Sequence, residues 1–420
     1  MKLRQNKITI NNILPILLVL PIILSYFESQ QLFKLFNTLI LPFVAVWLAK
    51  KYIRINILVL ALVLNALIGL LIVPVYDNYM HNDYLHIVSY LTLLLGAYYF
   101  SISLIHNIDS SLFRNLIISY FTIVIFHHLF VYIGIGEGNY FWDVNFITQR
   151  KIENAVFSNI GNGKYMTILL TVFALISTWF CRIKLYNKIL LNIILISFGI
   201  LSFSRALIIV VIISFIIFEL YRILILKKIK DYYLLAPIII LGIILFINNY
   251  DLIYLYVLRE DFTDLESISR IQQLEQYLVL IGDHIYFGTG WTDLDTILGS
   301  YLTHGKAELG GLMFIVEQGM FRGGILLVIM ILSIASMFVI NYKKLPKRLI
   351  PILLISFVSI LVGMVWGNNI VADIRSFIFW MAIFNFINVF INYNIFNIHS
   401  MNENYRNLKM LLLQNEFHQK

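Results

Sequence analysis

Three side chains in this sequence lie next to apolar runs and have types that can do chemistry. Two are permanently charged arginines, and the third is a histidine, which can exchange a proton. Arg205 separates two apolar runs, Arg270 lies in a long polar interval, and His304 stands where that interval ends. The guanidinium group of arginine is planar and always charged, so it matches two oxygens of one phosphate. Histidine is the side chain that most readily accepts a proton near neutral pH. Together these residue types suit chemistry on a phosphate ester or diphosphate.

Each of these side chains also has a structural interpretation. For Arg205 it is an arginine that snorkels to a membrane surface. For Arg270 it is a solvated helix face with neighbouring acids, and for His304 it is plain solvation. The sequence leaves both interpretations open for all three.

Two more ionisable residues, Glu317 and Arg322, lie at the start of an apolar run, shortly after Lys306. Ionisable groups within apolar helices usually face a cavity and pair with another group. We assign all three to substrate binding. A structural ion pair between Glu317 and Arg322, or with Lys306, is the alternative.

The elements that position these residues follow from composition. Of the 420 residues, 60% are hydrophobic and only 13% are charged, whereas a soluble domain has about 25% charged residues. The chain is therefore expected to be an all-α polytopic membrane protein. The net charge of +8 comes from short basic clusters between apolar runs, which is typical of orientation signals and not of a nucleic-acid site. The single cysteine excludes an intrachain disulfide.

A length of about 20 apolar residues per crossing predicts twelve transmembrane helices. They cover residues 9–27, 32–49, 55–75, 84–105, 114–135, 164–181, 187–203, 205–226, 232–249, 309–340, 349–367 and 376–394. The first half of the overlong tenth helix, Gly310–Phe321, is expected to be interfacial or re-entrant. The chain then divides into residues 1–249 with helices 1–9, a large loop at 250–308, residues 309–394 with helices 10–12, and an amphipathic tail at 395–420.

The orientation follows from the distribution of basic residues. Assigning alternate connecting segments and both termini to one side gives that side 21 of the 31 Lys and Arg residues but only 5 of the 23 acidic ones. Short cytoplasmic loops carry the excess of Lys and Arg. We therefore expect both termini in the cytoplasm and the loops at 136–163 and 250–308 outside. The first of these loops contains Trp142 and Arg150, an aromatic face and a cation for sugar binding.

The large loop has recognisable local structure. Thr263-Asp264-Leu265-Glu266 has the form of a capping box, and apolar residues recur after it at helical spacing. These signals predict an amphipathic helix over residues 264–281 at the outer mouth of the bundle, with Arg270 at the border of its apolar face. Gly288-Thr289-Gly290 is interpreted as a turn. Asp293-Leu294-Asp295 resembles a metal and nucleotide-sugar motif, but so short a pattern is common by chance, and we expect neither metal nor cofactor.

The order of these features resembles the O-antigen and capsular polysaccharide polymerases (Wzy-type) and the related O-antigen ligases. The resemblance rests on four features: Ser204-Arg205-Ala206 at the start of a span, Ser269-Arg270 and Gly288-Thr289-Gly290 in the large loop, and His304 followed by Glu317-Gln318-Gly319. The chain departs from the family at Gly305, where members often have asparagine after the histidine.

The resemblance implies a bacterial inner-membrane enzyme with its active site on the extracytoplasmic side. Its substrate would be an oligosaccharide linked to undecaprenyl diphosphate, which the enzyme polymerises without metal or nucleotide. Arg205 and Arg270 would hold the diphosphate, and His304 would take the proton of the acceptor hydroxyl. Membrane lipid, a chain-length regulator and a flippase are the partners that this role implies.

Two other functions fit the sequence as well. A ligase of the same superfamily would transfer finished glycan to another acceptor. A twelve-span transporter, such as a flippase for lipid-linked oligosaccharide, belongs to a different class, although transporter sites tend to lie near the bilayer midplane.

Overall fold

The computed structural model describes ten stretches of the chain and five single residues. The stretches are 40–48, 55–72, 81–108, 110–135, 161–181, 183–201, 265–289, 315–340, 349–366 and 377–391, and the single residues are Ile13, Ile16, Lys50, Ile216 and Leu345. Within these residues all regular structure is helical and there is no strand. The predicted all-α class is therefore confirmed for this part of the chain.

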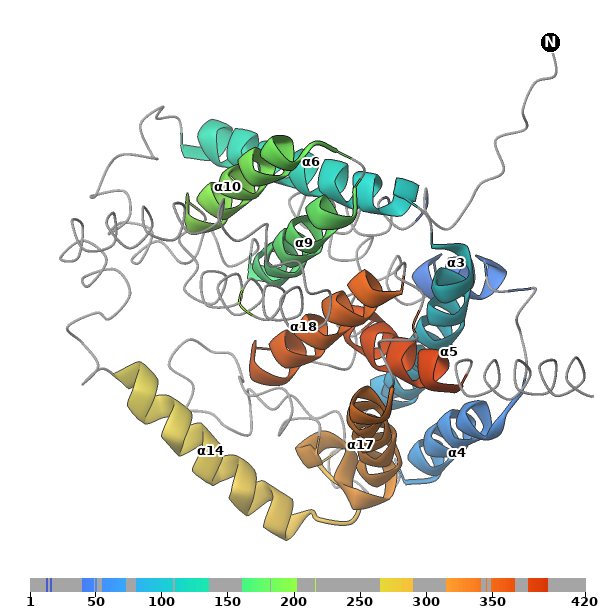
Figure 1. Ribbon diagram of the computed structural model, residues 1–420. Coiled ribbons are helices and arrows are strands. Elements are labelled where there is room, and N and C mark those ends of the chain that lie inside the picture. Colours follow the sequence, from blue (N-terminus) through green and yellow to red (C-terminus); the bar gives the residue numbers. More distant parts are fainter. Residues whose placement is uncertain are drawn as a thin grey trace, which may run out of the picture.

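The helices follow one another in the order shown in Figure 1. They are α3 (Leu41–Leu48), α4 (Ile57–Ile72), α5 (His81–Asn107), α6 (Ser110–Ile135), α9 (Gly161–Phe180), α10 (Leu185–Leu201), α14 (Leu265–Asp283), the π-helix η6 (Gly319–Gly323), α17 (Gly324–Val339), α18 (Ile350–Trp366) and the last helix (Phe377–Ile391). Helices occupy the described parts of nine of the twelve predicted spans, and the spans at 9–27, 205–226 and 232–249 fall almost or entirely outside the described residues. The number of spans stays a prediction.

The last helix lies at the centre of the described bundle. Every residue from Phe377 to Phe386 is buried. Its polar side chains connect it to neighbours, because Asn385 donates a hydrogen bond to Ser356 of α18 and Asn388 donates one to Ser101 of α5. Interhelical hydrogen bonds of this kind are common between helices in membranes.

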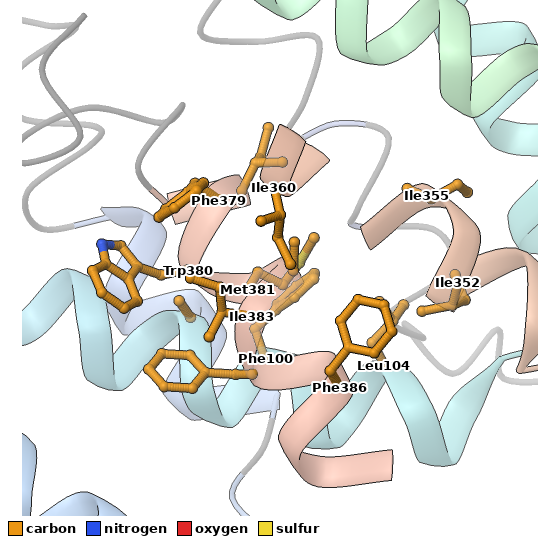
Figure 2. Packing of buried hydrophobic residues seen from close by; sticks show 14 of the residues in the cluster. Phe100, Leu104, Ile352, Ile355, Ile360, Phe379, Trp380, Met381, Ile383 and Phe386 are labelled. Atoms are coloured by element: carbon orange, nitrogen blue, oxygen red, sulfur yellow. The ribbon is translucent and has the colours of Figure 1, made fainter. Parts of the chain in front are cut away.

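Apolar packing completes the centre of the bundle. Figure 2 shows Phe100 and Leu104 of α5, Ile352 and Ile355 of α18 and the side chains of the last helix in one cluster. In the same view the indole nitrogen of Trp380 lies at the edge of the cluster and points away from the other labelled side chains. A second group of helices forms beside this centre, where α9 packs against α6, α10 and α18.

The outer surface of the helices is apolar as well. Helix α4 buries Leu62 and Asn65 on one side and exposes a leucine-rich stripe on the other, made of Ile57, Leu60, Leu64, Leu67 and Leu71. A helix that is hydrophobic all round is either enclosed by protein or surrounded by lipid. Since the leucine-rich stripe is exposed on the protein surface, contact with lipid is the favourable environment for it.

Two helices in the described residues are long and apolar enough to cross a membrane, Ile87–His106 and Ile315–Val339. Shorter apolar helices accompany them at Ile57–Ile72, Thr171–Phe180, Tyr186–Leu195, Ile350–Gly363 and Phe377–Ile391. Length and composition thus indicate membrane association.

Candidate polar site at an interrupted helix

The helix at residues 315–339 is interrupted near its start. It widens into the π-helix η6 at Gly319–Gly323 and continues as α17. Gly319 has a φ of +60°, a conformation that only glycine adopts without strain. Single π-turns within α-helices are rare and frequently mark functional sites. The expected interfacial or re-entrant helix at Gly310–Phe321 is not separate in its described part, because residues 315–318 run through η6 into α17.

A turn after α14 is hydrogen-bonded to this interruption. The backbone N–H of Thr289 donates to the carbonyl of Val316 at 2.9 Å, and those of Met320 and Phe321 donate to the carbonyls of Ile285 and Tyr286 at 2.8 and 3.1 Å. The widened turn would otherwise leave backbone groups without partners in an apolar surrounding, which is expensive. The turn therefore stabilises η6, and η6 fixes the end of α14.

Two glycines make this close approach possible. Gly288 also has a positive φ, of 75°. A Cβ atom at Gly288 would lie 2.5 Å from the carbonyl oxygen of Glu317 and the nitrogen of Gly319. A Cβ atom at Gly319 would overlap the backbone of Gly288, Phe287 and Tyr286. The structure has the turn at residues 284–287, directly before the predicted Gly288-Thr289-Gly290 turn; Gly288 and Thr289 follow it, and Gly290 lies outside the described residues.

Arg322 is the charged group that the interruption carries into the bundle. Its side chain is fully buried, and its guanidinium lies against α4, where a Cβ atom at Gly69 would be 2.7 Å from Arg322 Nε. The side-chain amide of Asn65, one helical turn before Gly69, donates a hydrogen bond of 2.6 Å to the carbonyl of Arg322. Asn65 and Gly69 therefore form the part of the α4 surface against which Arg322 packs.

Glu317 and Gln318 lie beside Arg322 in the same buried region. Glu317 is 4% exposed and Gln318 is fully buried. The positive charge of Arg322 acts on the carboxyl of Glu317, and both charges act on the hydroxyl of Tyr90 in α5, which also interacts with Trp380. In the described part of the chain the amide of Gln318 makes no hydrogen bond. The site therefore combines a buried acid and a buried arginine with a polar side chain, Gln318, that can accept a further partner.

Among the predicted site residues, the structure brings Glu317 and Arg322 together. The two side chains are buried close enough to interact electrostatically, while a salt bridge between them and substrate binding by them both stay predictions. Arg270 is part of α14, seven residues before the buried Tyr277 and hence at nearly the same angular position on the helix. Arg205, His304, Lys306, Arg150 and Trp142 lie outside the described residues.

The structure shows which side of α14 is covered. Leu274 and Leu278 of the predicted apolar face are exposed, and Tyr277 is buried. A pattern at helical spacing defines a face and not the medium that the face meets. The bounds of the helix, Leu265–Asp283 against the predicted 264–281, are confirmed.

Five residues of the polar site were missed by sequence reasoning: Asn65, Gly69, Tyr90, Gln318 and Trp380. Asn65 and Gly69 interrupt an otherwise apolar helix at a spacing of four, which is a usable signal for a polar contact. The described residues contain no cluster of three or more His, Cys, Asp or Glu side chains that could hold a metal ion.

The described fold and site define an all-helical protein with membrane-spanning features and a buried ionic group. No protein-family model, curated protein or solved structure matches the chain. A statement about function therefore depends on the residues themselves.

Proposed function

We propose that this protein is a membrane glycosyltransferase that polymerises oligosaccharide units linked to undecaprenyl diphosphate. The observation that carries the proposal is the connection between the charged interval and the interrupted span. The turn that follows α14, the helix that contains Arg270, is joined by backbone hydrogen bonds to the segment that contains Glu317 and Arg322. The charged interval is thus attached to an apolar helix, which supports a site for a lipid diphosphate between them.

The reaction suits fixed cations. The acceptor hydroxyl of one lipid-linked unit attacks the anomeric carbon of another glycan, the bond from that carbon to the diphosphate oxygen breaks, and the diphosphate leaves with the electron pair. Preorganised positive groups aimed at the developing charge lower the barrier. In this proposal Arg205 and Arg270 hold the diphosphate and His304 accepts the hydroxyl proton. Lys306, Arg150 and Trp142 contact the glycan, and no metal is required.

The same proposal includes the placement of the chain. Twelve spans, both termini in the cytoplasm and the 250–308 interval outside would put α14 on the extracytoplasmic side of a bacterial inner membrane. The excess of Lys and Arg in the alternate connecting segments supports this orientation.

Purified protein incubated with a synthetic undecaprenyl-diphosphate oligosaccharide tests the reaction directly. We expect a ladder of multiples of the unit on sizing, and only single units from Arg205→Ala and Arg270→Ala. Arg114→Ala is the matched control, because Arg114 is an exposed arginine of α6 on the side expected to face the cytoplasm. Normal ladders from both arginine variants would contradict the proposal. If cells that carry these variants instead accumulate long glycan chains that are not attached to their final acceptor, the protein is a ligase.

A flippase is the second candidate because the span at 315–339 is interrupted next to a buried charge. Transporters often place their sites at such interrupted helices. Reconstituted protein that moves the lipid-linked oligosaccharide between leaflets and forms no polymer would favour this candidate.

A further inference from the structure

An exposed apolar patch lies where α14 meets the interrupted span. It consists of Leu274 and Leu278 of α14, Tyr286 and Phe287 of the turn, and Met320 and Phe321 of η6. Their exposed fractions lie between 38 and 63%. A contiguous surface of this kind on a protein marks a place that contacts another apolar phase or molecule.

The patch has a fixed shape. The ring of Phe321 lies 5.4 Å from that of Phe287 and 6.0 Å from that of Tyr286, measured between centroids. The turn that carries these rings is hydrogen-bonded to η6 through the backbone of Met320 and Phe321. Residues from two distant parts of the chain therefore form one surface.

The patch continues onto the outer side of a helix that is suited to cross a membrane. Phe321 lies within the apolar helix Ile315–Val339. Further along α17 the exposed side chains are again large and apolar, at Val328, Ile331, Leu332, Phe338 and Val339. In a membrane these side chains face lipid. The patch extends the same apolar surface sideways along α14, which stands apart from the other labelled helices along most of its length (Figure 1).

We propose that α14 lies in the membrane interface with this patch inserted among phospholipid acyl chains. Interfacial helices bury an apolar side about 5–10 Å into the boundary between headgroups and acyl chains. The exposed Glu275, Asp283 and His284 are then the polar groups that meet water and headgroups. Tyrosine is enriched at this depth because its ring is apolar and its hydroxyl is wet, which suits Tyr286. The proposal does not depend on the reaction that the protein performs.

The side chains around the aromatic rings favour lipid over saccharide as the partner of this patch. Sugar-binding surfaces combine aromatic faces with several polar groups that fix the hydroxyls. Here the other exposed side chains of the patch, among them Leu278 and Met320, are apolar, and Phe321 belongs to the same helix as the exposed apolar side chains of α17.

Depth-dependent quenching tests the proposal. The chain has one cysteine, so Cys181→Ser provides a cysteine-free background for Leu278→Cys, Tyr286→Cys and the exposed polar control Asp283→Cys. Each is labelled with an environment-sensitive fluorophore in vesicles of phosphatidylcholine and phosphatidylglycerol. We expect doxyl-labelled lipid to quench positions 278 and 286 several-fold more than position 283, and aqueous iodide to show the reverse order.

Three results would overturn the proposal. Iodide that quenches all three positions equally, without lipid quenching, would place α14 in water. Positions 278 and 286 that neither quencher reaches would mean that protein covers the patch, and protection by a soluble oligosaccharide would make it a sugar surface. Should the Cys181→Ser background fail to fold, Cys181 can be retained, because it is buried and the exposed positions label first.

Discussion

At the scale of single residues, the structure buries Arg322 beside Glu317, and the ion-pair interpretation of the two can be tested. Removing one member of a buried charge pair leaves the other uncompensated and costs about 3–5 kcal/mol. We therefore expect Arg322→Met and Glu317→Gln each to lower the unfolding midpoint in detergent strongly. The double variant should be less destabilised than the two single effects together, since no isolated charge remains.

A double-mutant cycle on thermal unfolding measures this coupling. Contacting groups show interaction energies of about 0.5–3 kcal/mol in such cycles. Strictly additive effects would mean that Glu317 and Arg322 do not stabilise one another, and the ion-pair interpretation would then be wrong.

Gly69, on the surface of α4 that packs against Arg322, yields a second prediction at the same scale. A methyl group at Gly69 would lie 2.8 Å from Arg322 Cζ, so Gly69→Ala should force the guanidinium to move and cost about 1–3 kcal/mol. The matched control is Gly324→Ala, a helical glycine of α17 with open space around the added methyl. Alanine has the higher helix propensity, so the control should unfold at the same temperature as wild type or higher. Equal effects of both substitutions would contradict the packing described for Arg322.

At the scale of elements, the contact between the 284–289 turn and η6 depends on Gly288 and Gly319. Both have positive φ, and a Cβ atom at either would meet backbone and not a flexible side chain. Gly288→Ala and Gly319→Ala should therefore be more destabilising than Gly69→Ala, because backbone strain of about 1–3 kcal/mol adds to an overlap that no rotamer relieves. Gly282→Ala in α14, which meets open space, is the control. Wild-type protease resistance of α14 in both variants would show that the turn does not hold the helix.

The elements themselves were largely predictable from the sequence, and their contacts were not. Apolar length and the capping pattern predicted α14 and most of the other described helices to within a few residues, because helix formation in an apolar run is a local property. The hydrogen bond from Asn65 to Arg322 joins residues 257 positions apart in the chain, and the π-turn at Gly319–Gly323 is hydrogen-bonded to Ile285 and Tyr286. Nothing local to either segment encodes such a contact. The exposure of Leu278 could not be read from the pattern either, since periodicity does not reveal which face meets the bundle.

At the scale of the whole molecule, the last helix and α17 connect the polar site to the bundle. Trp380, which interacts with Tyr90 beside the buried charges, belongs to the fully buried stretch Phe377–Phe386. Ser333 of α17 donates a hydrogen bond to the carbonyl of Ile383 at 3.3 Å. The buried Glu317 and Arg322 are thus held between the centre of the fold and the turn that follows α14, which is hydrogen-bonded to the π-helix η6. A movement of α14 would therefore displace the segment that carries Arg322.

The orientation of the whole chain provides the last prediction. The excess of Lys and Arg in alternate connecting segments predicts that Lys50 lies in the cytoplasm and Asp283 outside. In the Cys181→Ser background, a membrane-impermeant maleimide should label Asp283→Cys in intact cells and Lys50→Cys only after permeabilisation. Both side chains are exposed, so a difference between them reports sidedness and not burial. The opposite result would put Arg270 and its helix in the cytoplasm, where a glycan displayed on the outer leaflet could not reach them, and the proposed polymerase would be wrong.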